Sequence, residues 1–292
     1  MIRAIDHLVL PVASLSAART RYEALGFAVN PIGVHPFGTA NCCVFLADGT
    51  YVELLAIHDP ARIAEVISVN AFVAMDRRFR QSAGPEGLSA VALQSHDPDA
   101  DELAFAAAGR GGQNRLAFTR KAIHPDGTED ILSVDGAFCI DPGVPSLGFF
   151  TCHWRSAPEV VARIKKPGAH RNAVAALGTV WIVADEPRAV KPYLEVALSG
   201  RLDEVPGGFR LRLQNADIAL IDGDEFRAMT ESVLPFAPVA GAAVTFVSSD
   251  MAITRQCLEQ AGIDYHTRQG RLIIAPVPGQ ATTILIEEQQ GH

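Results

Sequence analysis

Apolar and polar positions along residues 1–57 follow an order that predicts one compact supersecondary unit. Residues 5–12 form an apolar run of strand length, and apolar residues then recur at helical spacing between Leu15 and Leu25. Gly26 can end this helix in a left-handed conformation. Three strand-like runs follow and complete a β-α-β-β-β unit: 27–34, 41–46 and 50–57.

The same order of elements returns three more times. The later copies begin with apolar runs at 88–95, 179–184 and 243–248. Each run is followed by a helical pattern that ends at a glycine: Gly109, Gly200 and Gly262. Pro192 falls inside the third helix, where it predicts a kink or a later helix start. The glycines are unevenly spaced, which indicates a repeated architecture with variable loops rather than a solenoid of fixed period.

Pairing of these units is expected because one unit has one apolar sheet face and cannot bury it alone. Paired units can curl their sheets around a common cleft, so the sequence predicts an α+β fold of four βαβββ modules in two pairs. The least regular stretch, 155–176, contains few strand signals and is where we expect the linker. The expected domains are therefore residues 1–155 and 176–292.

Composition narrows the class of protein. The 292 residues are 48% hydrophobic and 20% charged, which is normal for a globular chain. The net charge of -8 and the lack of a basic run argue against nucleic acid as a partner. No apolar stretch reaches the roughly 20 residues of a membrane span, and no signal peptide is recognisable, so we expect a cytoplasmic protein without a membrane partner. Five cysteines without a Cys-x-x-Cys pair indicate buried thiols rather than disulfides or a zinc ribbon.

Two polar residues interrupt apolar strands of the first unit. His7 lies in the first strand on one face with Val9, and Glu53 lies in the middle of the last strand. A buried carboxylate without a partner is costly, so Glu53 needs a cation, a donor network or a metal. Histidine and carboxylate on adjoining strands suit a divalent metal. A core histidine at His7 and a buried Arg or Lys partner for Glu53 are the alternatives.

Several segments of the first unit together resemble a known family. Residues 5–10 (Ile-Asp-His-Leu-Val-Leu), 18–27 and 49–55 (Gly-Thr-Tyr-Val-Glu-Leu-Leu) resemble the vicinal-oxygen-chelate superfamily, and most of all its glyoxalase-like domain branch. Residues 35–41 (His-Pro-Phe-Gly-Thr-Ala-Asn) are similar to a recurring His-Pro…Gly-Thr-x-Asn segment of that branch. The resemblance is strong over 4–57 and moderate near 149–153. It implies glyoxalase/extradiol-dioxygenase-like domains, with paired modules curled around a metal and ligand cleft.

The resemblance implies metal ligands on the first and last strands of two paired modules. His7 and Glu53 match the positions of the first module. In the second module Ala90 stands near the first-strand position and cannot ligate, which departs from the family pattern. His153 on the last strand is the best third ligand, although it could instead line the surface. The predicted set of His7, Glu53 and His153 would hold a divalent zinc, manganese, nickel or iron ion with positions left open.

Other residues near this set are predicted to serve the chemistry. Glu53 could act as base as well as ligand, and His35 is expected in acid–base catalysis unless it is an exposed turn residue. Asn41 and His170 are expected to contact the substrate. Asn41 could instead satisfy a strand end, and Arg171 after His170 departs from a His-Pro-Asn segment of some relatives. The third and fourth modules have no matching ligand pair and are expected to support or cover the first two.

Three functions remain open from the sequence. The first is a metal-dependent lyase or isomerase acting on a small oxygenated substrate chelated to the metal. The second is an extradiol-type dioxygenase, although the lack of metal ligands in the C-terminal modules argues against it. The third is a non-catalytic binder of a small molecule such as an antibiotic, which 7% aromatic residues disfavour. A homodimer is plausible because such modules also pair between chains, although pairing within one chain already meets that need.

Overall fold

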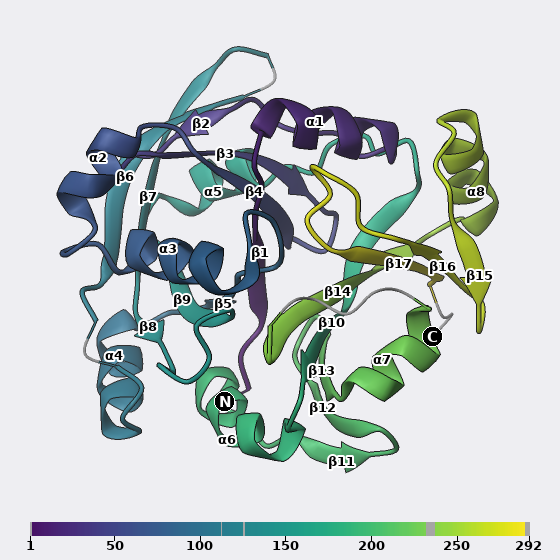
Figure 1. Ribbon diagram of the computed structural model, residues 1–292. Helices are drawn as coiled ribbons and strands as arrows, with labels where there is room; N and C mark the ends of the chain where they lie inside the picture. The colour runs from purple at the N-terminus through teal and green to yellow at the C-terminus, as the bar shows by residue number, and fades with distance from the viewer. Residues whose placement is uncertain (1, 112, 125, 232–236, 290–292) are drawn as a thin grey trace.

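Two sheets lie side by side in the computed structural model, which describes residues 2–111, 113–124, 126–231 and 237–289 (Figure 1). The first sheet contains β1 (Ile5–Pro11), β2 (Gly33–Val34), β3 (Thr39–Phe45), β4 (Tyr51–Ile57), β5 (Ala90–Gln94), β6 (Leu116–Ile123), β7 (Glu129–Gly136), β8 (Phe138–Cys139) and β9 (Gly148–Trp154). The second contains β10 (Val174–Ala184), β11 (Asp203–Val205), β12 (Gly208–Arg212), β13 (Asp217–Ile221), β14 (Val239–Ser248), β15 (His266–Arg268), β16 (Arg271–Ile274) and β17 (Thr283–Glu288).

Each sheet is built from two consecutive units of the sequence repeat. The first has the strand order β2-β3-β4-β1-β5-β9-β7-β6, and the second has β11-β12-β13-β10-β14-β17-β16-β15. The two units of a sheet meet where their first strands pair antiparallel, β1 with β5 and β10 with β14. The predicted α+β fold of four βαβββ modules in two pairs is therefore confirmed.

The first sheet curls until its two edges meet. Strand β1 is parallel to β4 in the first module, and β5 is parallel to β9 in the second. These four strands form the centre of the sheet, two from each module. The edge strands β2 and β6 contact each other across the opening. This closure leaves an almost barrel-like sheet with a cavity on its inner face.

Eight helices cover the sheets or connect their strands in the described part of the chain. They are α1 (Leu15–Ala24), α2 (Pro60–Val66), α3 (Ala71–Ala83), α4 (Pro98–Ala107), α5 (Pro158–Ile164), α6 (Pro187–Leu198), α7 (Gly223–Thr230) and α8 (Met251–Gln260). Side chains of Ser14, Asp97 and Asp250 accept hydrogen bonds from the first turns of α1, α4 and α8. Helix α6 begins at Pro187 and continues through Pro192, so the later start that Pro192 allowed is not found.

The segment expected to be a linker carries a helix that packs on the first sheet. Helix α5 contacts β7, and Ile164 at its end reaches the inner cavity. Three further helices, α2, α3 and α7, occupy stretches for which the sequence pattern gave no prediction. Residues 27–32, expected to begin a strand, lie outside β2. The division into domains at 155 and 176 stays a prediction.

One hydrophobic core joins the two sheets. Buried side chains from both halves, including Tyr22, Phe149 and Tyr193, belong to a single cluster. The Tyr193 hydroxyl donates to main-chain oxygens of the first half, and the Tyr22 hydroxyl donates to the Gln280 main-chain oxygen of the second. No helix among the described residues is long and apolar enough to cross a membrane.

The five cysteines are all buried and unpaired, which confirms the expectation of buried thiols. Burial raises the pKa of Cys42 to about 11 and that of Cys139 to about 12, and it raises the pKa of Cys43 and Cys152 well above the ordinary value. A thiol must ionise to react. We therefore expect a disulfide reagent at mildly alkaline pH to leave these four thiols of the native chain unmodified, while all five cysteines react after unfolding. Rapid modification of any of these four in the native chain would contradict the burial.

Candidate functional site

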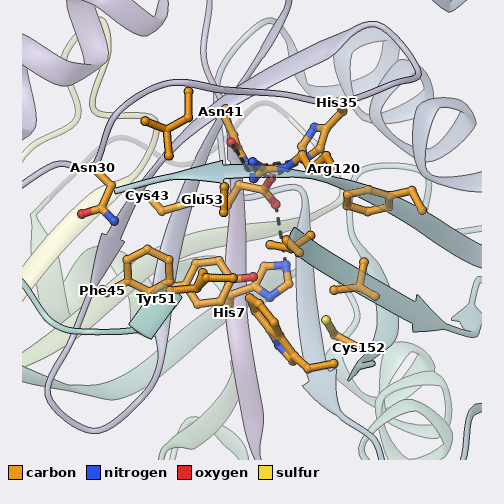
Figure 2. Close-up of a pocket in the computed structure, with 18 of the residues that line it drawn as sticks. His7, Asn30, His35, Asn41, Cys43, Phe45, Tyr51, Glu53, Arg120 and Cys152 are labelled. Atoms are coloured by element: carbon orange, nitrogen blue, oxygen red, sulfur yellow. Dashed lines mark hydrogen bonds and ion pairs between the residues drawn. The ribbon is translucent and has the colours of Figure 1, made fainter. Parts of the chain in front are cut away.

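A pocket occupies the inner face of the first sheet. It encloses about 830 Å³ of empty space, part of it open to solvent. Five of its polar side chains come from β1, the loop before β3, β3 itself, β4 and β6: His7, His35, Asn41, Glu53 and Arg120 (Figure 2). The structure therefore brings four of the six predicted site residues into one cavity.

Glu53 lies at the centre of this polar group. Alternation along β4 turns it inward with Tyr51, and only 5% of its surface is exposed. Its Oε1 accepts a hydrogen bond from Asn41 Nδ2 at 2.6 Å. Its Oε2 lies 3.6 Å from His7 Nε2, and its Oε1 lies 3.7 Å from His35 Nε2. Among the described residues no Arg or Lys forms an ion pair with it, so the alternative of a buried basic partner is not what the chain uses.

Both histidine rings are oriented by a hydrogen bond to their other nitrogen. His7 Nδ1 lies 2.8 Å from Asp6 Oδ1, and His35 Nδ1 lies 2.8 Å from the Thr39 hydroxyl. Each ring thereby directs its Nε2 toward Glu53, as outer partners do for metal-binding histidines. Burial, together with the charges of Arg120 and His7, lowers the pKa of His35 well below its ordinary value. The neutral imidazole that results is the form that can bind a metal.

Asp6 anchors His7 and is itself held from the other side. It is 1% exposed, and its Oδ2 accepts from Lys165 Nζ at 2.8 Å and from Trp154 Nε1 at 3.2 Å. Burial alone would raise the pKa of Asp6, but the hydrogen bond from His7 and the charge of Lys165 outweigh it and keep that pKa low. The β1–β5 register shifts between Ile5 and His7, so adjacent side chains escape strict alternation there.

A second group of donors lies on the far side of His7. Donor atoms of Asp6, His7 and Cys152 lie within 4.8 Å of one another. Burial raises the pKa of Cys152 well above its ordinary value, and a metal-bound cysteine must be a thiolate. Asp6 is already paired with Lys165. The side of His7 that faces Glu53 is therefore the better place for a cation.

The second module supplies apolar side chains where the first supplies ligands. Strand β5 repeats β1, with Ala90 in the place of His7, and β9 repeats β4. The strand registers then put Phe150 in the place of Glu53. Neither side chain can bind a metal, so the second module offers no ligand at the two positions equivalent to His7 and Glu53.

His153 does not join the first-module residues. Strand β9 turns Phe150 and Cys152 into the pocket, so the two-residue period puts His153 on the opposite face. Its Nδ1 lies 3.0 Å from the Ser95 main-chain oxygen. The prediction of His153 as third ligand is therefore not supported by its position, and the reason is the phase of β9.

His170 is also placed away from the pocket. Its Nδ1 accepts from the Ala28 main-chain N–H and its Nε2 donates to the Phe45 main-chain oxygen, each at 2.9 Å. Burial lowers the pKa of the His170 ring. The ring thus fixes the loop after α5 against the first module, with no nitrogen left for a substrate.

Aromatic side chains form much of the pocket wall, contrary to the expectation from composition. The chain has only 14 Phe, 4 Tyr and 2 Trp, yet seven of these rings line this one cavity. They are Phe37, Phe45, Tyr51, Phe72, Phe118, Phe150 and Trp154. The argument that 7% aromatic content disfavours an aromatic-lined pocket is therefore wrong, because folding gathers rings that are scattered along the sequence.

Sequence reasoning also missed Asp6, Lys165 and Arg120. An Asp-His pair inside a buried strand was the available signal for Asp6. Lys165 reaches the site from the position that follows α5, and Arg120 reaches it from β6. Both are far from His7 in the chain, and no local pattern marks them. In the second sheet the corresponding inner face carries a small apolar cluster that includes Trp181, Ile221 and Leu285, and Trp181 and Ile221 also line a second pocket.

Comparison with known proteins agrees with this fold. A model of the glyoxalase-like domain matches residues 5–198, whereas no curated protein matches the chain. A hypothetical protein from Staphylococcus aureus superimposes with a TM-score of 0.69 at 12% identity, over 99% of this chain and 100% of that one. A mutant 4-hydroxymandelate synthase from Streptomyces coelicolor gives 0.60 at 13%, over 99% and 93%. The Mn(II)-bound glyoxalase from Novosphingobium aromaticivorans gives 0.58 at 13%, over 98% and 82%. At these identities the likeness to the three structures shows the fold alone.

Proposed function

This chain belongs to the glyoxalase-like domain family of the vicinal-oxygen-chelate superfamily, and on that premise we propose that it is a metal-dependent lyase or isomerase. Its substrate would be a small molecule with two neighbouring oxygens. One observation carries the proposal: the Nε2 atoms of His7 and His35 both face the buried carboxylate of Glu53. Both rings also have Nδ1 engaged elsewhere, by Asp6 and Thr39.

The donor types suit a divalent cation, and Asn41 Nδ2, which lies 3.4 Å from His35 Nε2 and 2.6 Å from Glu53 Oε1, would have to move to admit it. His7, His35 and Glu53 form a two-histidine, one-carboxylate set that leaves positions open for substrate or water. In this proposal His35 replaces His153 as the third donor. A bound cation would polarise the substrate oxygens and stabilise negative charge that develops on them.

Glu53 is the residue that would move the proton. Asn41 Nδ2 donates to its Oε1, whereas among the described residues no hydrogen bond reaches its Oε2, which lies 3.6 Å from His7 Nε2. Oε2 is therefore free to take a proton from a substrate carbon beside a polarised oxygen and to return it elsewhere. Glu53 is only 5% exposed, so few water molecules can compete with the substrate for this proton.

Cation binding by paired histidine variants tests the proposal. We expect the chelator-treated wild type to take up one divalent cation per chain in calorimetry and elemental analysis. His35→Gln should bind at least about tenfold more weakly, since even partners of ligands contribute this much. His153→Gln should bind like the wild type. Wild-type protein that takes up no cation would sink the proposal, and weakening by His153→Gln alone would restore the ligand set expected from the sequence.

A non-catalytic binder of a small molecule is the second candidate. The observation in its favour is the ring-lined wall of the pocket, together with apolar Ala90 and Phe150 where further ligands would stand. A ligand that binds tightly and is recovered unchanged in the presence of the cation would favour the binder. An extradiol-type dioxygenase would differ from both by consuming oxygen with iron bound. Cytoplasmic location and homodimer formation stay predictions.

A further inference from the structure

Arg120 is a basic side chain that the reaction proposed above leaves without a role. It extends from β6 into the pocket, where its Nη2 donates to Asn41 Oδ1 at 3.4 Å and its Nη1 donates to the Lys121 main-chain oxygen at 3.0 Å (Figure 2). Its Nε is buried and has no hydrogen-bond partner. Among the residues the structure describes, no carboxylate forms an ion pair with it. A guanidinium has five N–H donors, so most of its donor capacity is open.

The position of Arg120 separates it from the proposed cation. Asn41 stands between the two ends of the pocket: its Oδ1 accepts from Arg120 and its Nδ2 donates to Glu53. The Arg120 side chain is partly buried and its Nε atom is fully buried, so a counterion would be favourable there, and a planar fork of donors matches a carboxylate. The pocket therefore has an anion-binding end beside its acid–base end.

The space around these polar groups suits a flat apolar body. His35 stacks on Phe37 with ring centroids 4.8 Å apart, and Phe118 meets both rings edge-on. Phe45 and Tyr51 pack 4.8 Å apart on another part of the wall. Aromatic faces and edges of this kind bind planar apolar groups.

We propose that the pocket takes an aromatic or similarly planar carboxylic acid, with its carboxylate on the Arg120 guanidinium and its ring against Phe37 and Phe118. The proposal names the class of substrate that the site binds. It rests on the proposed function only for the reaction that the bound acid undergoes. Binding itself needs Arg120 and the aromatic wall, not the cation.

The backbone of β2 provides a way to displace Arg120 without removing it. A Cβ on Gly33 would lie 2.5 Å from Arg120 Nη1 and 2.9 Å from Asn41 Oδ1, so it would act on the contact between these two side chains. The guanidinium is the far end of a flexible side chain, so Gly33→Ala should push it aside and still fold. Lys121, the next residue on β6, has an exposed ammonium and offers a matched loss of one positive charge.

Calorimetry with chelator-treated full-length protein and three probes tests this proposal. The probes are phenylacetate, its neutral analogue phenylacetamide, and acetate. We expect the wild type to prefer phenylacetate to phenylacetamide by at least about tenfold, the value of one charge-assisted contact, and to bind acetate more weakly still. Arg120→Met and Gly33→Ala should abolish the preference for the acid, whereas Lys121→Met should keep it.

Several results would overturn the proposal. The first is a wild type that binds phenylacetate and phenylacetamide equally well. The second is an Arg120→Met variant that loses the same affinity for the acid and the amide. The third is a preference for the acid that survives in both Arg120→Met and Gly33→Ala when these variants are folded. Because cation is removed, these outcomes are independent of the metal titration above. If the protein binds the acid but takes up no cation, the acid-binding proposal stands and the proposed metal-dependent reaction is wrong. If it takes up a cation but shows no preference for the acid, the acid-binding proposal is wrong and the metal-dependent reaction stands.

Discussion

Glu53→Gln is expected to remove cation-dependent stabilisation while making the cation-free protein more stable. In the wild type, a cation at about 1,000 times its dissociation constant adds about 4.1 kcal/mol to the free energy of unfolding. Loss of the charged donor should weaken binding by at least about 100-fold. At the same cation concentration the variant would then gain no more than about 1.4 kcal/mol.

The rise in cation-free stability has a separate cause. Glu53 is 5% exposed, and Asn41 is the one close hydrogen-bond donor to its carboxylate within the described part of the chain. A glutamine amide keeps the bond from Asn41 and can donate to His7 Nε2, while the cost of a buried charge disappears. We expect the free energy of unfolding without cation to rise by about 1–2 kcal/mol. A substitution that stabilises a protein in this way is common at residues that are kept for function at a cost in stability.

Urea unfolding with and without cation measures both effects. Glu65→Gln on α2 is the matched control, since Glu65 is exposed and, of the residues the structure describes, forms an ion pair with Arg62 alone, three residues before it. It should unfold like the wild type in either condition. A Glu53→Gln protein that is still stabilised by cation to the wild-type extent would show that the carboxylate is not a ligand.

Lys165→Met is expected to produce the largest loss of stability outside the apolar core. The variant leaves the 1% exposed Asp6 carboxylate without its cationic partner at 2.8 Å. Breaking a buried ion pair on one side costs about 3–5 kcal/mol. The methionine stem still fills the space beside the rings of Tyr51 and Trp154, so lost packing contributes little.

Two comparisons isolate the ion pair in urea unfolding. Lys166→Met, on the exposed neighbour, should change the free energy of unfolding by less than about 0.5 kcal/mol. Adding Asp6→Asn to Lys165→Met should recover part of the loss, because the unpaired charge is then gone. If the double variant is as unstable as the sum of the single ones, Lys165 does not act through Asp6.

The order of elements and two site residues could be predicted from short stretches of sequence. Alternation along single strands and helical spacing after them are local properties, and a repeat of the same pattern shows the modules. His7 and Glu53 were recognisable because each is a polar residue inside an apolar strand. Asn41 and His35 belong to one short segment that resembles the family, and the structure places both beside Glu53.

The rest of the site depends on where distant strands lie. Alternation says that Cys152 and His153 point to opposite faces of β9, but only the curl of the sheet decides which face is the inner one. Arg120 comes to the pocket because edge strand β6 closes against β2.

The sequence by itself therefore determined the repeated modules, their pairing and the His7–Glu53 pair, since each follows from periodicity within a few residues. Tertiary structure alone decided that His153 turns away, that α5 brings Lys165 to Asp6, and that seven scattered aromatic rings gather in one cavity. The physical reason is that closure of the sheet and packing of a helix on it are set by many long-range contacts at once. No single segment of the chain contains that information.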